Sequence, residues 1–241
     1  HSHILSSTIP NCKSYDPAYG YELAVIIEHG LKEMYKDKKN YFYYLTVTNE
    51  RYVQPPKPKG KDIDNNIIKG MHRISKTKKP QIRLLGSGAI LNESIKATEI
   101  LNGYGIESEV WSVTSFNMLR KDGMETENTN IKNLSKPKKS FVETSFLGND
   151  IPTISSTDYM RAYSEQIRPY ISSSYYTLGT DGFGRSDSRA KLREFFEVDA
   201  NSIVMTSAYA LYKDGKIEKK ELQKIYKDIK VDKNKTSPWN V

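Results

Sequence analysis

The string HSH at the start of the chain holds the only closely spaced pair of histidines, His1 and His3. Residues two apart on an extended segment lie on the same side, so both imidazoles could serve one site. Histidine changes its charge near neutral pH and acts as an acid, a base or a metal ligand. The pair is therefore a candidate catalytic site, and the remnant of an affinity tag is its non-functional alternative.

A glycine-rich string, LGTDGFGRSDSRAKL at residues 178–192, leads into a predicted helix. It lacks the spacing and the lysine of a P-loop, and its glycine order is the reverse of a dinucleotide-binding fingerprint. Free amides at a helix N-terminus could still bind an anion, assisted by Arg185 and Arg189. We favour a closed turn, in which three side chains cap the helix and pair with the arginines: Asp181, Ser186 and Asp187.

The remaining motifs indicate structure rather than chemistry. Gly86 and Gly88 in LLGSGAIL predict a tight turn between a strand and a helix, because the rest of a nucleotide-binding fingerprint is missing. His29 and His72 are predicted to be solvated surface residues. The motifs G-x-S-x-G and H-E-x-x-H and a cysteine–histidine pair are absent from the sequence, so hydrolase and zinc functions have no support.

Hydrophobic periodicity predicts the elements that position these residues. A helix at 19–35 precedes a buried aromatic strand at 41–49, and the run 122–139 predicts a helix end and a long surface loop. The face predicted to be apolar in the first helix comprises Leu23, Ile26, Ile27 and Leu31. The later strands are predicted at 81–88, 107–116, 151–156 and 175–180, and the later helices at 89–105, 157–171 (capped by Thr157 or Asp158), 188–196, 202–213 and 218–227. Strands alternating with helices across short turns predict an α/β fold with a parallel sheet.

A proline-rich stretch, ERYVQPPKPKGKDIDNN, predicts an extended and solvated connection. We place a domain boundary near Pro55 to Lys61. Residues 55–77 are then a linker between an N-terminal part, residues 1–54, and an α/β domain, residues 78–241.

The composition is that of a folded chain with a charged surface. Of the 241 residues, 37% are hydrophobic and 27% are charged, and the formal net charge is +8. The lysines are scattered over several polar strings without an aromatic stripe, so we predict no nucleic-acid partner. No run approaches the roughly 20 apolar residues of a membrane span, and the single cysteine, Cys12, cannot form an internal disulfide. We therefore expect a cytoplasmic protein without a membrane partner.

Several unusual strings, in the same order and at compatible spacing, resemble the C-terminal part of the homodimeric bacterial pyruvate dehydrogenase E1 family, a branch of the transketolase superfamily. The resemblance runs from His1 to Val241. The strings are HSHILSSTIPNCKSYDPAYGYELAVIIEHGLKEMY, YYLTVTNERYVQPPKP, LLGSGAIL, VWSVTSF, STDYMRAYSEQIRPY and LGTDGFGRSDSRAKLREFFEVDA.

The resemblance implies a fold and an activity. Residues 1–54 would be the incomplete C-terminal end of a pyrimidine-binding domain, and residues 78–241 a transketolase C-terminal-like domain with a mostly parallel mixed sheet flanked by helices. The full-length enzyme would use thiamine diphosphate and Mg²⁺ to decarboxylate pyruvate, and would pass the acetyl group to the lipoyl group of the E2 dihydrolipoyl acetyltransferase. It would act as an E1 homodimer.

The resemblance also implies what the 241 residues lack. The family's metal and diphosphate motif, G-D-G followed at a distance by asparagine, does not occur here, and the glutamate that activates the thiamine ring is expected before His1. The 241 residues alone are therefore predicted not to bind the cofactor tightly and not to turn over pyruvate. In the superfamily, the segment that HSH matches carries an active-site histidine, which His3 matches better than His1. Such a histidine would donate a hydrogen bond or a proton to the substrate oxygen.

Three alternatives remain open. The first is a stand-alone α/β module that binds a phosphate or a nucleotide with the loop from Gly179 to Arg189. The second, weaker, is a basic nucleic-acid binder. The third is a related branch of the family that acts on other 2-oxo acids.

Overall fold

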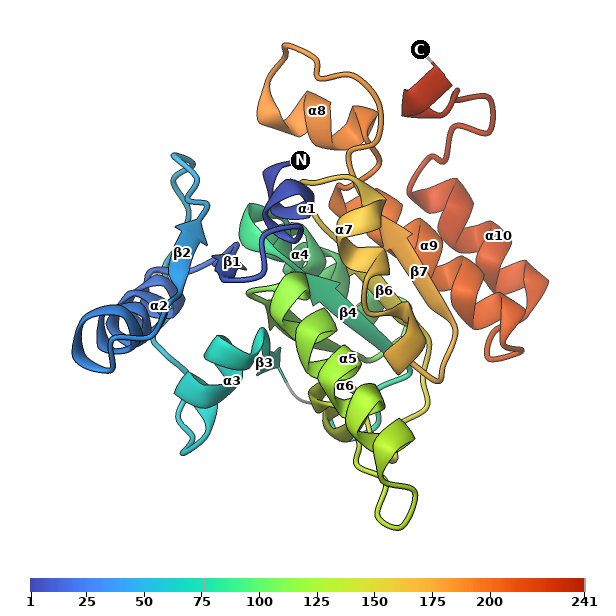
Figure 1. The fold of residues 1–241 in the computed structure, drawn as a ribbon. Helices are drawn as coiled ribbons and strands as arrows, with labels where there is room; N and C mark the ends of the chain where they lie inside the picture. The colour runs from blue at the N-terminus through green and yellow to red at the C-terminus, as the bar shows by residue number, and fades with distance from the viewer. Residues whose placement is uncertain (76, 241) are drawn as a thin grey trace.

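The computed structural model, which describes residues 1–75 and 77–240, is built around a five-stranded sheet (Figure 1). Its strands are β3 (Met71–Ser75), β4 (Ile82–Gly86), β5 (Ser108–Val113), β6 (Thr153–Ser156) and β7 (Tyr175–Leu178). They lie in the order β3-β5-β4-β6-β7, with β3 antiparallel to β5 and the other pairs parallel. The predicted α/β fold with a mostly parallel mixed sheet is confirmed.

The central strands are buried on both faces of the sheet. Successive side chains of a strand point to opposite faces. Leu84 and Val110 therefore join the core on the side of α4 (Leu91–Asn102) and α9 (Ala200–Lys213), whereas Leu85 and Trp111 join the core on the side of α5 (Phe116–Lys132). Burial on both faces explains why these strands read as apolar runs and do not alternate with polar residues.

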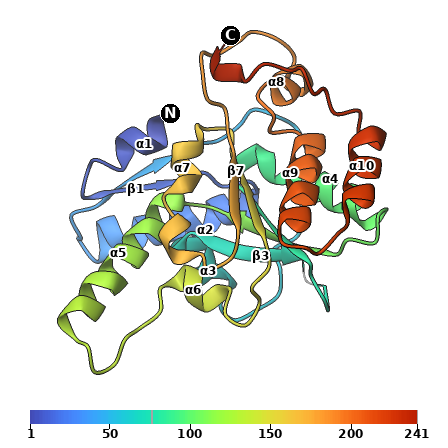
Figure 2. The same ribbon diagram turned by 90° about the vertical axis from the view of Figure 1, so that its right-hand side faces the viewer.

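Helices cover both faces of the sheet (Figure 2). One face is covered by α4 and α9, with α10 (Lys219–Asp228) packed against α9. The other face is covered by α5, α6 (Phe141–Ser145) and α7 (Arg161–Glu165). Short helices in the connections are η2 (Gly88–Ile90), η3 (Arg168–Tyr170) and α8 (Arg189–Phe195), and η4 (Pro238–Asn240) follows α10.

The residues before Pro55 form a smaller unit beside this sheet (Figure 1). Its strands, β1 (Cys12–Tyr15) and β2 (Phe42–Leu45), pair in parallel. Its helices are α1 (Ser2–Ser6), α2 (Gly20–Leu31) and the π-helical turn η1 (Lys32–Lys36). The prediction that 41–49 is a buried strand is wrong: β2 is short and only half-buried, because β1 is its one sheet neighbour in the described part of the chain.

The buried face of α2 differs from the predicted one. Ile26 is buried as predicted, but Ile27 and Leu31 are 43% and 51% exposed. The helix instead buries Glu22 and Gly30, because Glu22 reaches the large sheet and Gly30 lies against the ring of Tyr43. The hydrophobic pattern therefore predicted the wrong face, because a polar residue and a glycine occupy two of the buried positions.

The predicted linker, residues 55–77, is only partly an extended connection. Residues 51–60 have no regular secondary structure, but the chain then forms α3 (Ile63–Lys69) and the edge strand β3. Ile67 and Met71 are fully buried, so this segment belongs to the core although its surroundings are polar. The domain division at 1–54, 55–77 and 78–241 stays a prediction.

One further strand differs from its predicted bounds. The strand predicted at 107–116 ends earlier, and the side chain of Ser115 caps α5 by accepting from the amide of Met118 at 3.0 Å. The run 122–139 is helical as far as Lys132 and has no helix or strand from 133 to 139, so the predicted helix end and surface loop are confirmed.

The helix predicted at 157–171 is also shorter than expected, and it is interrupted. It comprises α7 and η3, and its N-cap is Met160 instead of Thr157 or Asp158. Thr157 and Asp158 continue the chain beyond the carboxyl end of β6, which places Asp158 in a cavity described below.

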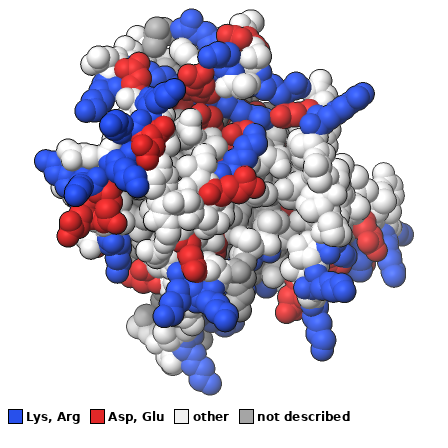
Figure 3. All heavy atoms as spheres, turned by 180° about the vertical axis from the view of Figure 1, so that it is seen from behind, with Lys and Arg blue, Asp and Glu red and all other residues white. Residues whose placement is uncertain are grey.

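The surface charge is mixed. On the face shown in Figure 3, Lys and Arg side chains lie among Asp and Glu side chains and surround a neutral area. Within residues 1–75 and 77–240, no helix has the length and apolar character that a membrane crossing requires.

Candidate functional site

A cavity of about 650 Å³ lies where the carboxyl ends of the two sheets meet. Asp16 and Thr46 reach it directly after β1 and β2 of the small sheet. Ala89, Asp158 and Thr180 reach it from the segments after β4, β6 and β7 of the large sheet. The carboxyl edge of a parallel sheet is where α/β proteins bind their ligands. This cavity is therefore the candidate functional site.

Asp16 is a buried carboxyl group at this cavity, with an exposed fraction of 7%. Its Oδ1 accepts a hydrogen bond from Thr46 Oγ1 at 2.7 Å, and its Oδ2 accepts one from Ser87 Oγ at 2.5 Å. Burial raises the pKa of Asp16 to about 6, although the two hydroxyl groups oppose the rise. Asp16 can therefore change its protonation state close to neutral pH.

His3, the preferred catalytic residue of the sequence prediction, is fully buried. Its ring stacks on Tyr163 at a centroid distance of 4.9 Å, and its Nε2 lies 2.9 Å from Thr46 Oγ1. Burial lowers the pKa of His3 to about 4, so the ring is neutral at physiological pH. His3 does not line the cavity, and it contacts the cavity through Thr46.

His1, the second predicted catalytic residue, does line the cavity. It is exposed, and its Nδ1 accepts a hydrogen bond from the amide of Met160 at 3.1 Å. The two histidines therefore do not face one site side by side. His1 is the N-cap of α1 and His3 lies within this helix, and one faces the cavity and the other the core.

The glycine-rich loop forms one wall of the cavity through Gly182, Gly184, Arg185 and Arg189. Ser188, which was not among the predicted caps, caps the seven-residue helix α8 by accepting from the amide of Lys191. The predicted cap residue Asp187 accepts from the amide of Ser188, and Asp181 pairs with Arg161 on another helix. The predicted caps are therefore wrong.

The arginines of this wall are used in different ways. Arg189 donates to Asn49 at 2.5 Å, and Arg193 forms ion pairs with Glu50 and Glu93. The guanidinium of Arg185 lies over the ring of Phe195, 5.1 Å from its centroid. Because α8 is short and capped, and two arginines already bind carboxylate or amide oxygens, the loop makes a poor phosphate site on its own.

The conformation of the glycine-rich loop requires glycine at Gly182. Its φ of +101° is in a region that L side chains rarely adopt, and a Cβ there would lie 2.9 Å from the carbonyl oxygen of Pro238. Trp239 follows Pro238 and covers the guanidinium of Arg161, 5.0 Å from its ring centroid. The loop is therefore held against the C-terminal segment.

The two sheets are joined by a buried carboxylate, Glu22 of α2. Its Oε1 accepts from His72 Nε2 at 2.7 Å and from Ser112 Oγ at 2.5 Å, and its Oε2 accepts from the amides of Ala18 and Tyr19. His72 is fully buried, so the prediction that it is a solvated surface residue is wrong. The prediction failed because His72 lies in a basic string of the sequence but faces inward from strand β3.

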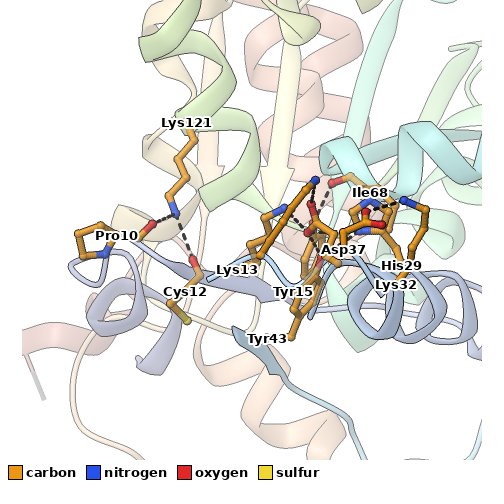
Figure 4. Close-up of polar contacts among 12 residues, drawn as sticks. Pro10, Cys12, Lys13, Tyr15, His29, Lys32, Asp37, Tyr43, Ile68 and Lys121 are labelled. Carbon is orange, nitrogen blue, oxygen red and sulfur yellow. Dashed lines mark hydrogen bonds and ion pairs between the residues drawn. The ribbon is translucent and has the colours of Figure 1, made fainter. Parts of the chain in front are cut away.

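The other histidine that was predicted to lie on the surface, His29 of α2, is also not a free surface residue. Figure 4 shows Lys13, His29 and Tyr43 converging between α2 and the small sheet. His29 Nδ1 lies 2.9 Å from the Tyr43 hydroxyl, which donates to Glu33 Oε2 at 2.6 Å. Glu33 also pairs with Lys13 and Lys39. This cluster fixes the end of the helix and lies away from the cavity.

The described residues do not build a metal and diphosphate site. They contain no group of three or more His, Cys, Asp and Glu side chains that could hold a metal ion. The cavity carries the carboxyl groups of Asp16, Glu50 and Asp158 beside the guanidinium groups of Arg185, Arg189 and Arg193, so its charge is mixed. It also offers a histidine and hydroxyl groups, which can donate hydrogen bonds to the oxygen atoms of a small substrate.

Sequence reasoning missed Asp16, Thr46, Ser87 and Asp158 as site residues. The signal that could have found them is positional, because each lies within two residues of the carboxyl end of a parallel strand. Two of the four follow the short strands β1 and β2. Strand β1 had not been predicted, and β2 had been predicted to continue past Thr46.

Comparison with known proteins identifies both parts of the chain. Residues 1–55 match the model of the pyruvate dehydrogenase E1 component middle domain, and residues 70–199 match that of the transketolase-like TK C-terminal domain. The pyruvate dehydrogenase E1 component of Pseudomonas aeruginosa is 50% identical over 99% of this chain, and that of Escherichia coli is 45% identical over 99%. The chain spans 27% of the length of each of these relatives.

Solved structures show the same fold at low identity. A transketolase from Leishmania mexicana has a TM-score of 0.63 at 15% identity, over 87% of this chain and 27% of its own. A transketolase variant from Pichia stipitis has a TM-score of 0.62 at 18% identity, over 88% of this chain and 27% of its own. The chain therefore belongs to the pyruvate dehydrogenase E1 family and carries its transketolase-like C-terminal domain.

Proposed function

We propose that this chain is part of an enzyme that oxidatively decarboxylates pyruvate with thiamine diphosphate and Mg²⁺ and transfers the acetyl group to the lipoyl group of an E2 dihydrolipoyl acetyltransferase. The observation that carries the proposal is the 50% identity, over 99% of the chain, to a relative named pyruvate dehydrogenase E1 component. The cavity supports it, because residues from both matched family domains line it.

Within this proposal, the chain supplies substrate-facing side chains, and residues outside the 241 bind the metal and the diphosphate. His1 faces the cavity and has a titratable ring, so it suits a hydrogen bond or a proton transfer to the substrate oxygen. The buried and neutral His3 suits a supporting role. This reverses the order of preference that the resemblance implied for the two histidines.

The remaining parts of the proposal concern partners and location. We expect an E1 homodimer in the cytoplasm, with pyruvate preferred over other 2-oxo acids and with E2 as the acceptor. The identities of 42–50% to relatives that all carry the name pyruvate dehydrogenase E1 component support this choice.

A hybrid enzyme tests the proposal. This chain would replace the matching part of the Escherichia coli pyruvate dehydrogenase E1 component, to which it is 45% identical over 244 residues. The hybrid is expected to reduce an artificial electron acceptor with pyruvate and to acetylate the lipoyl domain of E2. A folded hybrid that binds thiamine diphosphate but gives no turnover with pyruvate, and turns over another 2-oxo acid, would contradict the substrate assignment.

A further inference from the structure

We propose that Asp16 is a catalytic residue of the cavity and exchanges a proton with the bound substrate. Thr46, Ser87 and His3 are its positioning residues. The inference rests on the proposed function, because the substrate is the 2-oxo acid that occupies the cavity in that proposal.

The position of Asp16 is the first argument. It directly follows β1 at the junction of the two sheets, lines the cavity, and is 7% exposed. In the described part of the chain, Asp16 forms no ion pair with a Lys, Arg or His side chain. An unpaired buried carboxyl group costs folding free energy, and such groups in clefts mark functional sites.

The hydrogen bonds of Asp16 fix its orientation. One hydroxyl donates to each oxygen, Thr46 at 2.7 Å and Ser87 at 2.5 Å, which leaves further lone pairs for a ligand. The amide of Gly88 donates to the Asp16 carbonyl at 3.1 Å. A Cβ at Gly88, whose φ is +52°, would lie 2.5 Å from Asp16 Oδ2, so the turn after β4 is shaped around this carboxyl group.

His3 acts on Asp16 through Thr46. The Thr46 hydroxyl has one proton, which it donates to Asp16, so it must accept from His3 Nε2–H at 2.9 Å. The buried Nδ1 of His3 has no hydrogen-bond partner among the described residues, which is compatible with the neutral Nε2–H tautomer. The order of donation is therefore His3 to Thr46 to Asp16, and His3 orients the hydroxyl without losing its proton.

The surroundings tune the protonation of Asp16. Burial raises its pKa, the hydroxyls of Ser87 and Thr46 lower it, and the charges of Asp158 and Glu22 raise it again, to about 6. Among the described residues, the titratable groups that interact with it include Glu22 of α2, Tyr52, Asp158 and Tyr159 after β6, and Tyr163 of α7, and His3 of α1 contacts it through Thr46. A group with this pKa can serve as a base and as an acid at neutral pH.

The proton transfer is balanced without a further reactant. The carboxylate of Asp16 accepts a proton from the hydroxyl group that the oxo oxygen of the substrate forms during the reaction, and the O–H bond to Asp16 forms as that O–H bond breaks. The carboxylic acid then returns the proton to the oxo oxygen of the next substrate molecule as this oxygen gains negative charge. No electrons are transferred, and the two transfers leave Asp16 in its starting state.

Replacing the carboxyl group tests the inference in the hybrid enzyme. Asp16→Asn should lower kcat about 100-fold or more and remove the acid limb of the kcat profile near pH 6. The matched control is Asp64→Asn, the same change at an exposed residue of α3, which should leave kcat and its pH profile unchanged.

Two further variants separate positioning from a merely structural role. Thr46→Val and Ser87→Ala each remove one donor to the carboxylate, so each should move the acid limb to higher pH while the protein stays folded. Wild-type turnover in Asp16→Asn, or an unshifted limb in both donor variants, would overturn the inference while the proposed function stands.

An NMR titration tests the inference even if the hybrid enzyme is inactive, because it does not measure turnover. In the 241-residue chain, the ¹³C resonance of the Asp16 carboxyl should titrate with a midpoint near 6, and Thr46→Val should raise that midpoint. If the hybrid lacks activity, only the proposed function is contradicted, and the midpoint decides the inference. A midpoint near the ordinary aspartate value of about 3.9 overturns it.

Discussion

The Oε1 atom of Glu22 lies 2.7 Å from Nε2 of His72, and both side chains are fully buried. The two residues belong to the two segments that match different family domains, the middle domain and the transketolase-like C-terminal domain. The contact therefore joins the two parts of the chain behind the cavity that both of them line. A disturbance of this pair should loosen the junction that positions Asp16 and His1.

Glu22→Gln is expected to lower the free energy of unfolding by about 3 kcal/mol, because one side of the new amide presents N–H groups to existing donors in a buried site. Chemical denaturation of the chain measures it. Glu28→Gln, the same change at an exposed residue of the same helix, should stay within about 0.5 kcal/mol of the wild type. Equal stabilities of the two variants would contradict the role of Glu22.

Asp16 should reduce stability at neutral pH. Its pKa is raised to about 6 in the folded protein from 3.8, so folding favours its protonated form. The stability it contributes is present below about pH 3.8 and is lost as the pH rises through 6. Asp16→Asn removes the titrating group, so the variant does not lose this stability as the pH rises. The difference in unfolding free energy, variant minus wild type, should rise between pH 4 and pH 7 by as much as about 3 kcal/mol. A difference that stays flat over this range would contradict the raised pKa.

Glu33 should affect the pH dependence of the unfolding free energy in the opposite direction, and at lower pH. Burial opposes its ionisation, but hydrogen bonds from Lys13, Tyr43 and Lys39 outweigh burial and lower its pKa from 4.5 to about 2. The stability it contributes is present above pH 4.5 and is lost as the pH falls towards 2. Unfolding curves of Glu33→Gln and the wild type should therefore converge over this interval. A constant separation would show that the ionised cluster does not stabilise the fold.

The large sheet could be predicted because its strands are apolar runs that alternate with helices, and β4 to β7 lie within the predicted ranges. The site was harder to predict than the sheet, because its members are single polar residues that follow strands of two separate sheets. Ser87 and Asp16 are far apart in sequence, and they come to 2.5 Å because the turn after β4 contacts the end of β1. His72 was misjudged because only the first two residues of the short strand β3 are buried, and a basic string follows them, so no periodic signal is present.

The isolated 241 residues are expected not to bind thiamine diphosphate with micromolar affinity in the presence of Mg²⁺. The described residues contain no group of carboxylates and histidines that could hold the metal, and Arg189 and Arg193 at the cavity already bind Asn49 and Glu50. Titration calorimetry of the chain measures this directly, with the hybrid enzyme as the positive control. Mg²⁺-dependent micromolar binding to the isolated chain would show that it holds a cofactor site of its own.

The two histidines should respond differently to substitution in the hybrid enzyme. His1 is exposed at the cavity, so His1→Ala should lower kcat about 100-fold or more with little change in unfolding free energy or cofactor affinity.

His3 should depend on its hydrogen bond and not on its charge. His3→Phe keeps an aromatic ring against Tyr163 but removes the donor to Thr46, so turnover should fall. His3→Gln places an N–H near the position of Nε2, so it should restore much of the turnover if His3 only orients Thr46. A histidine that itself delivered a proton would be replaced by neither side chain, because neither phenylalanine nor glutamine titrates. Equal loss of turnover in His3→Phe and His3→Gln, with both variants folded, would therefore return the catalytic role to His3.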